Sequence, residues 1–98
     1  MAQPDHQSLK RLAAKYIWWK SAGEAVTMPE RVVAQVMNIG DYIDVQSLAE
    51  QIGDDYLREV LLHAEIGQFT ERSWSYWHYR LGLAKPGHVP PMPARRFA

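Results

Sequence analysis

Residues 70–83, Thr-Glu-Arg-Ser-Trp-Ser-Tyr-Trp-His-Tyr-Arg-Leu-Gly-Leu, hold the densest group of aromatic side chains in this 98-residue chain. One set of large side chains recurs at i, i+3, i+4 and i+7, which predicts a helix with one buried face. That set is Trp74, Trp77, His78 and Leu81. The helix is expected to open at Thr70 or Glu71 and to close at Gly82, leaving Tyr76, Tyr79 and Arg80 on its outward face.

The same period runs through the preceding sequence. It predicts helices over residues 8–20, 27–39, 44–52 and 55–66, each followed by a glycine. The stretch Thr27-Met28-Pro29-Glu30 has the form of a capping box with proline in the first turn. Gly40 is expected to end that helix as a left-handed cap.

No segment shows the alternation of apolar and polar residues that is typical of a strand. We therefore expect an all-α fold, a compact bundle of about five short helices with an extended Pro-rich C-terminal tail. Ninety-eight residues are enough for one domain. The predicted division is a helical domain over residues 1–83 and an extended, basic, Pro-rich tail over residues 84–98.

The tail contains four of the six prolines and has no helical period. It is either a floppy extension or a strap that lies on this protein or on a partner, with Phe97 as an anchor. Deletion of residues 85–98 is expected to leave the helical domain folded and to weaken partner binding.

Composition excludes several kinds of chemistry. The chain has no cysteine, so disulfides, thiolate metal sites and a cysteine nucleophile are absent. Its four histidines are not spaced like metal ligands, and there is no phosphate-binding loop or nucleophile elbow. The sequence predicts no catalytic residues, no metal and no cofactor. A cytoplasmic location is expected, since no signal peptide or membrane-length apolar run is present.

Charge is unevenly distributed although the formal net charge is zero. Residues 1–23 carry four Lys and Arg residues against one Asp, and residues 24–71 carry ten acids against two arginines. Residues 72–98 carry five basic residues and no acid. Either the basic ends fold back onto the acidic middle, or two faces of opposite sign meet different partners.

Tyr, Trp and Arg dominate the energetics of protein interfaces, so their exposure here favours a binding module over an enzyme. The predicted partner-binding residues are Trp18, Tyr76, Tyr79, Arg80, Arg95, Arg96 and Phe97. The alternative is a nucleic-acid-binding transcriptional regulator that uses the basic, aromatic C-terminal third. Residues 45–62 loosely resemble a helix-turn-helix, but Asp54, Asp55 and Glu59 on its second helix would repel phosphates.

Three stretches together resemble small bacterial proteins encoded beside nucleotidyltransferase-like toxins of the AbiE class. The first begins Arg31-Val-Val-Ala-Gln-Val-Met-Asn-Ile-Gly and continues through an acidic turn to Val45. The second is Leu57-Arg-Glu-Val-Leu, and the third is the aromatic stretch Ser73–Leu83. The likeness covers about residues 30–83.

This resemblance implies a non-catalytic antitoxin whose partner is a nucleotidyltransferase-type toxin, neutralised by occlusion. The acidic middle of the chain would then face the basic cleft of the toxin. The tail lies outside the shared pattern, and the sequence leaves self-association open. A small enzyme acting through His63 or His78 is a third and weaker hypothesis.

Overall fold

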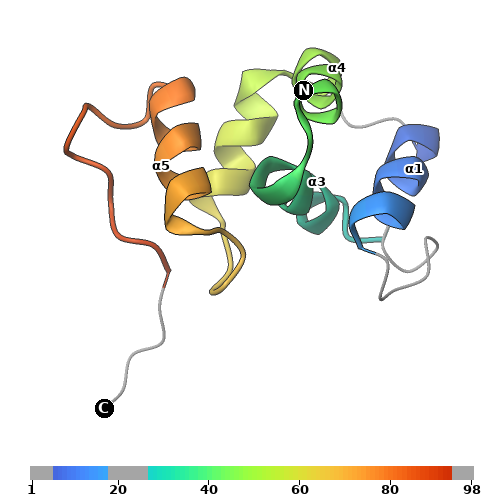
Figure 1. Cartoon of the computed structure of the whole chain (residues 1–98), viewed down its shortest axis with the longest axis horizontal. Helices are drawn as coiled ribbons and strands as arrows, with labels where there is room; N and C mark the ends of the chain where they lie inside the picture. The colour runs from blue at the N-terminus through green and yellow to red at the C-terminus, as the bar shows by residue number, and fades with distance from the viewer. Residues whose placement is uncertain (1–5, 18–26, 94–98) are drawn as a thin grey trace.

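The computed structural model describes residues 6–17 and 27–93. These residues form four helices and no strand, which confirms the all-α fold class: α1 (His6–Tyr16), α3 (Pro29–Ile39), α4 (Tyr42–Leu62) and α5 (Glu71–Arg80) (Figure 1). Helix α1 ends at Tyr16, short of the predicted end at residue 20. In the described part of the chain, no helix is long and apolar enough to cross a membrane.

The prediction of five helices is wrong in its count for the described residues. The two helices predicted over residues 44–52 and 55–66 fall in the single element α4. Its backbone is non-helical at Gly53, where the sequence predicted a break, and it ends at Leu62, short of the predicted end at residue 66. Gly53 has φ 80° and ψ 165°, a conformation that glycine adopts without the steric cost of a side chain. The glycine therefore marks a bend with helix on both sides and no separate loop.

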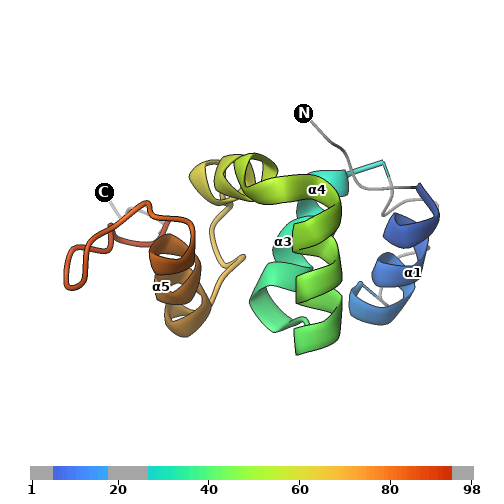
Figure 2. The same ribbon diagram turned by 90° about the horizontal axis from the view of Figure 1, so that it is seen from above.

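Helix α3 is the centre of the fold. It packs against α1, α4 and α5, and Figures 1 and 2 show it between α1 on one side and α5 on the other. An isolated helix of 11 residues is marginal in water. Five of its residues are buried, four of them with no exposed surface: Val32, Val33, Ala34, Val36 and Met37. Tertiary packing on several sides therefore stabilises α3.

Both ends of α3 differ from expectation. The helix begins at Pro29, so Met28 occupies the N-cap position and Thr27 does not form the predicted capping box. Proline at the first helical position presets φ and needs no N–H partner, which moves the start one residue along the chain. At the other end Gly40 is extended (φ −63°, ψ 148°), so the predicted left-handed cap is wrong.

Gly40 is instead required by close packing at the corner between α3 and α4. A Cβ atom there would lie 2.9 Å from Val36 Cγ1 and 3.1 Å from Val45 Cγ2, closer than ordinary contact. The Gly40 N–H donates to the Val36 carbonyl at 2.7 Å, which holds the corner tight. The atom nearest to that Cβ position is the Val36 carbonyl oxygen, so any side chain at residue 40 would force the backbone of this corner to shift.

A buried carboxylate joins α1 to the start of α4. Asp41 caps α4 by accepting the Asp44 N–H at 2.9 Å. Asp44 itself is only 5% exposed. It accepts hydrogen bonds from Tyr16 Oη at 2.6 Å, Lys15 Nζ at 2.8 Å and an Arg11 guanidinium nitrogen at 3.2 Å. Bonding to the Lys15 ammonium is the largest of the effects that lower the pKa of Asp44 to about 2.

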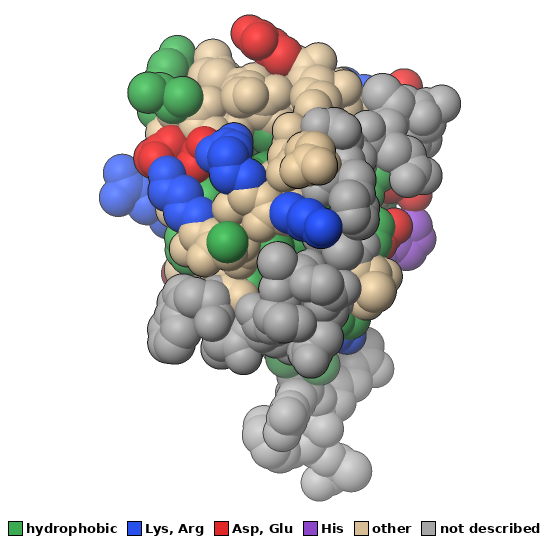
Figure 3. Space-filling model, turned by 90° about the vertical axis from the view of Figure 1, so that its right-hand side faces the viewer, with side chains coloured by type: hydrophobic (Ala, Val, Ile, Leu, Met, Phe, Trp, Pro, Cys, Tyr) green, Lys and Arg blue, Asp and Glu red, His purple; other side chains and the backbone are tan. Residues whose placement is uncertain are grey.

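These ion pairs settle part of the question raised by the charge distribution. Arg11 and Lys15 of the basic N-terminal part pair with Asp44, and Lys15 also pairs with Asp41 at 2.7 Å. Figure 3 looks onto the α1 side of the molecule and shows Lys and Arg side chains beside Asp and Glu side chains. The basic beginning of the chain therefore folds back onto acids of its middle.

Helix α5 follows the sequence prediction closely. Thr70 caps it by accepting the Ser73 N–H at 3.2 Å. The predicted inward stripe is buried throughout: Trp74, Trp77, His78 and Leu81. The Trp77 indole N–H donates to the Met37 carbonyl at 2.7 Å, which fixes α5 to the end of α3. Gly82 has φ 70°, and the Leu83 N–H bonds to the His78 carbonyl, so the helix ends in a Schellman motif.

Residues 84–93, here called the C-terminal strap, run along α5 without regular secondary structure (Figure 1). The Trp74 indole N–H donates to the Pro90 carbonyl at 2.8 Å. Val89 and Met92 are partly buried against the core. The strap therefore lies on this protein's own helix. Arg95, Arg96 and the proposed anchor Phe97 lie outside the described residues.

We expect Asp44→Asn to destabilise the protein by about 2 kcal/mol at neutral pH, because the lowered pKa of Asp44 is a measure of its native-state stabilisation. A carboxyl whose pKa is depressed on folding stabilises the fold above its ordinary pKa. That stabilisation disappears as pH falls from about 4 to about 2, through the folded-state pKa. Urea unfolding followed by circular dichroism at several pH values measures both effects.

The matched control is Asp54→Asn, which changes an exposed acid after the bend in α4. It should alter the free energy of unfolding by under about 0.5 kcal/mol. Other acids also titrate in this pH range, so the informative quantity is the difference between wild type and Asp44→Asn. A difference that stays constant from neutral pH to pH 2 would contradict the assignment.

Truncation before Lys85 should lower the free energy of unfolding by about 1–3 kcal/mol, because it exposes apolar core surface and removes the acceptor of the Trp74 indole. The helical domain should still unfold cooperatively. The control truncation removes only residues 94–98 and keeps these contacts. Equal unfolding free energies for the two truncated chains would show that the strap does not stabilise the fold.

Candidate functional site

The structure brings together only part of the predicted partner-binding set. Tyr76 and Arg80 are neighbours on the exposed face of α5, with the Arg80 guanidinium donating to Tyr76 Oη at 3.1 Å. Tyr79 is 44% exposed but lies beside the strap, where its hydroxyl accepts the Gly87 N–H at 3.3 Å. Trp18, like the three predicted tail residues, lies outside the described part of the chain.

Two residues of α4 complete a surface that the sequence did not reveal. Arg80 also donates to Gln46 Oε1 at 2.9 Å, and Gln46 Nε2 donates to Tyr42 Oη at 3.2 Å. We call the set Tyr42, Gln46, Tyr76 and Arg80 the aromatic patch. Tyr42 is 77% exposed and Tyr76 is 52% exposed. One continuous chain of hydrogen bonds therefore links two exposed tyrosines across two helices.

A depression of about 180 Å³ lies within the aromatic patch. Its lining includes Met37, Val45 and Trp77, which come from α3, α4 and α5. The Arg80 guanidinium lies 4.8 Å from the centroid of a Trp77 ring and 6.0 Å from that of Tyr76, within cation–π range. The patch thus combines an apolar floor with a fixed cationic group and two phenols.

The sequence contained one signal for the missing half of this surface. Tyr42 and Gln46 are four residues apart, so a helix that began at Tyr42 would place them on one face. The sequence prediction began that helix at residue 44 and left Tyr42 in a turn. The capping role of Asp41 fixes the true start of α4, which leaves Tyr42 exposed with the half-buried Gln46 beside it.

The basic C-terminal third is less compensated than the N-terminal part. In the described ranges, no ion pair involves Arg72, Arg80 or Lys85, whereas Arg31 pairs with Glu65 and Arg58 with Asp55. The cationic character of α5 and the strap therefore remains available to a partner.

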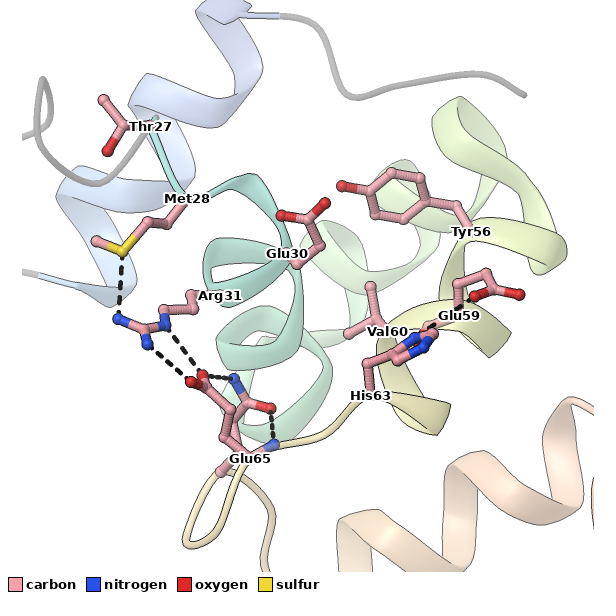
Figure 4. A pocket seen from close by; sticks show the side chains of 10 residues that line it. Thr27, Met28, Glu30, Arg31, Tyr56, Glu59, Val60, His63 and Glu65 are labelled. Carbon is pink, nitrogen blue, oxygen red and sulfur yellow. Dashed lines mark hydrogen bonds and ion pairs between the residues drawn. The ribbon is translucent and has the colours of Figure 1, made fainter.

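A second hollow, here called the polar cleft, lies between the beginning of α3, the second half of α4 and the loop that follows (Figure 4). Its volume is about 650 Å³. Most of the lining residues are polar or charged, although their apolar atoms supply much of the surface: Thr27, Met28, Glu30, Arg31, Tyr56, Glu59, Val60, His63, Glu65 and Gln68. No residue of this set was predicted as a binding residue from the sequence.

Two histidines were considered as acid–base groups, and their surroundings differ. His63 lies in the polar cleft, where Nδ1 is 2.9 Å from the Glu59 carbonyl oxygen and 3.5 Å from the Glu59 carboxylate. His78 is buried, and its Nδ1 donates to the Trp74 carbonyl at 2.7 Å. Within residues 6–17 and 27–93, no group of histidine and acidic side chains is arranged to hold a metal ion.

No protein-family model, no curated protein and no solved structure shows a significant match to the chain.

Proposed function

We propose that this chain is a non-catalytic protein-binding module, an antitoxin-like partner that neutralises a nucleotidyltransferase-type toxin by occluding it. The observation that carries the binding role is the aromatic patch, in which two exposed tyrosines and an arginine are held in one hydrogen-bonded arrangement. The choice of toxin as partner rests on the sequence resemblance over residues 30–83.

The composition of the patch favours a protein ligand. Tyr and Arg are enriched among residues whose truncation most weakens protein complexes. Association costs less when the contact side chains are already ordered, because fewer rotamers are lost on binding. The hydrogen bonds from Arg80 to Tyr76 and Gln46 supply this order before a partner arrives.

The charge and the apolar groups of the aromatic patch indicate what kind of partner surface would bind to it. Arg80 is bonded to neutral oxygens only, so its positive charge is not compensated within the described chain. A matching partner presents a carboxylate or backbone carbonyls to Arg80 and an apolar contact to Tyr42 and Tyr76. The depression beside them, with its apolar floor, accommodates a small apolar side chain of the partner.

The acidic middle of the chain contributes less to partner attraction than its composition suggested. Four of its acids already pair with basic residues of the same chain: Asp41, Asp44, Asp55 and Glu65. Glu30, Glu50, Asp54 and Glu71 are exposed and form no ion pair among the described residues, and the exposed Glu59 has only the His63 ring; these are the described acids available to a basic toxin surface. Charge steering by this segment is therefore secondary to the patch.

We expect Tyr42→Ala together with Tyr76→Ala to weaken binding to an AbiE-class nucleotidyltransferase of the same operon by about 30-fold or more, since hot-spot truncations typically cost 2 kcal/mol or more. Neutralisation of that toxin in a growth assay should fail in parallel. Calorimetry with the two purified proteins measures the affinity directly.

Leu62→Ala is the matched control, because Leu62 is an exposed apolar residue of α4 that lies outside the patch. It should bind and neutralise like wild type. The proposal fails if the double tyrosine variant, shown by circular dichroism to be folded, binds and neutralises equally well. It also fails in its choice of partner if the wild-type chain does not bind the enzyme.

The alternative function is nucleic-acid binding through the basic C-terminal third. The observation in its favour is that Arg72, Arg80 and Lys85 make no ion pair in the described chain, while Tyr76 and Tyr79 are exposed beside them. Such a site predicts RNA or DNA binding that weakens with salt at a log–log slope of about −2 to −3 for three phosphate contacts. A fluorescence anisotropy titration at several salt concentrations separates the two functions, because the protein-binding module should give no signal.

A further inference from the structure

We propose that the polar cleft is a binding site for a small organic cation that carries a guanidinium or primary ammonium group. This inference is independent of the aromatic patch, because the two sites share no lining residue. It depends on the charges that the cleft leaves uncompensated and on one buried hydroxyl that lacks a partner.

Internal pairing removes one positive and one negative charge from the cleft. Arg31 donates to both carboxylate oxygens of Glu65, at 2.9 Å from Nε and 2.7 Å from a terminal nitrogen. Gln68 Nε2 donates to the same carboxylate at 3.1 Å and accepts the Glu65 N–H through its Oε1 at 2.9 Å. Figure 4 shows Arg31 and Glu65 side by side, joined by dashed lines, on the far side of the lining from Tyr56. The Arg31–Glu65 pair with Gln68 stabilises the structure, and neither the positive charge of Arg31 nor the negative charge of Glu65 is available to a ligand.

Two carboxylates remain without compensation. Glu30 is exposed and forms no ion pair within the described chain, and the carboxylate of Glu59 has only the His63 ring, at 3.5 Å. They come from α3 and α4 and line the same hollow. A ligand with one or two positive charges is therefore attracted, and an anion is repelled.

The hydroxyl of Tyr56 is a second observation, independent of the two acids, that points to a ligand in the polar cleft. Its side chain is 6% exposed, and its hydroxyl is the buried side-chain polar atom that has no hydrogen-bond partner among the described residues. Buried hydroxyls are normally paired, because an unpaired one is costly. Figure 4 shows the hydroxyl directed toward Glu30, and the charge of Glu30 contributes, after burial, to raising the pKa of Tyr56.

A cationic N–H donor placed between Glu30 and Tyr56 would satisfy both groups. The Tyr56 oxygen would accept a hydrogen bond from the ligand, and the carboxylate would neutralise its charge. Glu30 is exposed, so its side chain can move to admit the donor. The Tyr56 ring and Val60 offer apolar surface for an alkyl stem, and a hollow of about 650 Å³ is of the size that holds small ligands.

The test is calorimetric titration of the full chain with agmatine, which carries a guanidinium at one end and an ammonium at the other. We expect saturable binding at concentrations up to about 1 mM. Glu30→Gln combined with Glu59→Gln should weaken that binding at least about tenfold, whereas Glu50→Gln, an exposed acid of α4 outside the cleft, should change it less than about twofold.

Tyr56→Phe gives a signature that a purely structural role would not produce. Removal of an unpaired buried hydroxyl should raise the melting temperature of the free protein by a few degrees or leave it unchanged. The same change should weaken agmatine binding several-fold, because the ligand loses an acceptor. A lower melting temperature with unaltered affinity would overturn the assigned role of this hydroxyl.

A second titration identifies the source of the cation. Binding of agmatine that depends on Glu30 and Glu59 indicates a free small molecule. Binding of the peptide Gly-Arg-Gly with the same dependence, and no binding of agmatine, indicates an arginine side chain of a protein partner. The proposal is overturned if neither probe binds, or if either binds equally well to the Glu30→Gln, Glu59→Gln variant.

Discussion

The fold depends on the burial of α3. This helix of 11 residues has too little intrinsic stability to persist alone, and four of its side chains have no exposed surface. Each of the other three helices in the described chain covers part of it. The contacts that join the elements are accordingly placed at its ends. Trp77 bonds to the carbonyl of Met37, and the Gly40 corner brings α4 back along the same core.

The carboxylate of Asp44 joins α1 to the rest of the fold. A charge this deeply buried is stable only where hydrogen bonds and opposite charges replace its hydration. Tyr16 and Lys15 provide them from the last turn of α1, so the position of that helix is tied to the corner between α3 and α4. This pairing also explains why a chain with strongly uneven charge in sequence is less polarised in three dimensions. The basic start and part of the acidic middle neutralise one another locally.

Local patterns were sufficient to predict some of this architecture from sequence. The cap at Thr70, the inward stripe of α5 and the glycine at its end all follow from residues within one short segment, and the structure contains each of them. Features that depend on distant residues were not accessible. Asp44 looks like an ordinary cap in sequence, because its burial depends on α1. Gly40 looks like a helix terminator, because the atoms of Val36 and Val45 that would crowd a side chain there come together only in the folded corner.

The same distinction applies to the candidate sites. Tyr76 and Arg80 could be named from their helix alone, whereas Tyr42 and Gln46 required the corner that places α4 beside α5. No sequence pattern predicted the polar cleft, because its lining residues come from separate segments between Thr27 and Gln68. The bend at Gly53 separates the half of α4 that bears Tyr42 from the half that bears Tyr56. Because the two hollows share no lining residue, the proposed protein partner and the proposed cation do not compete for any side chain.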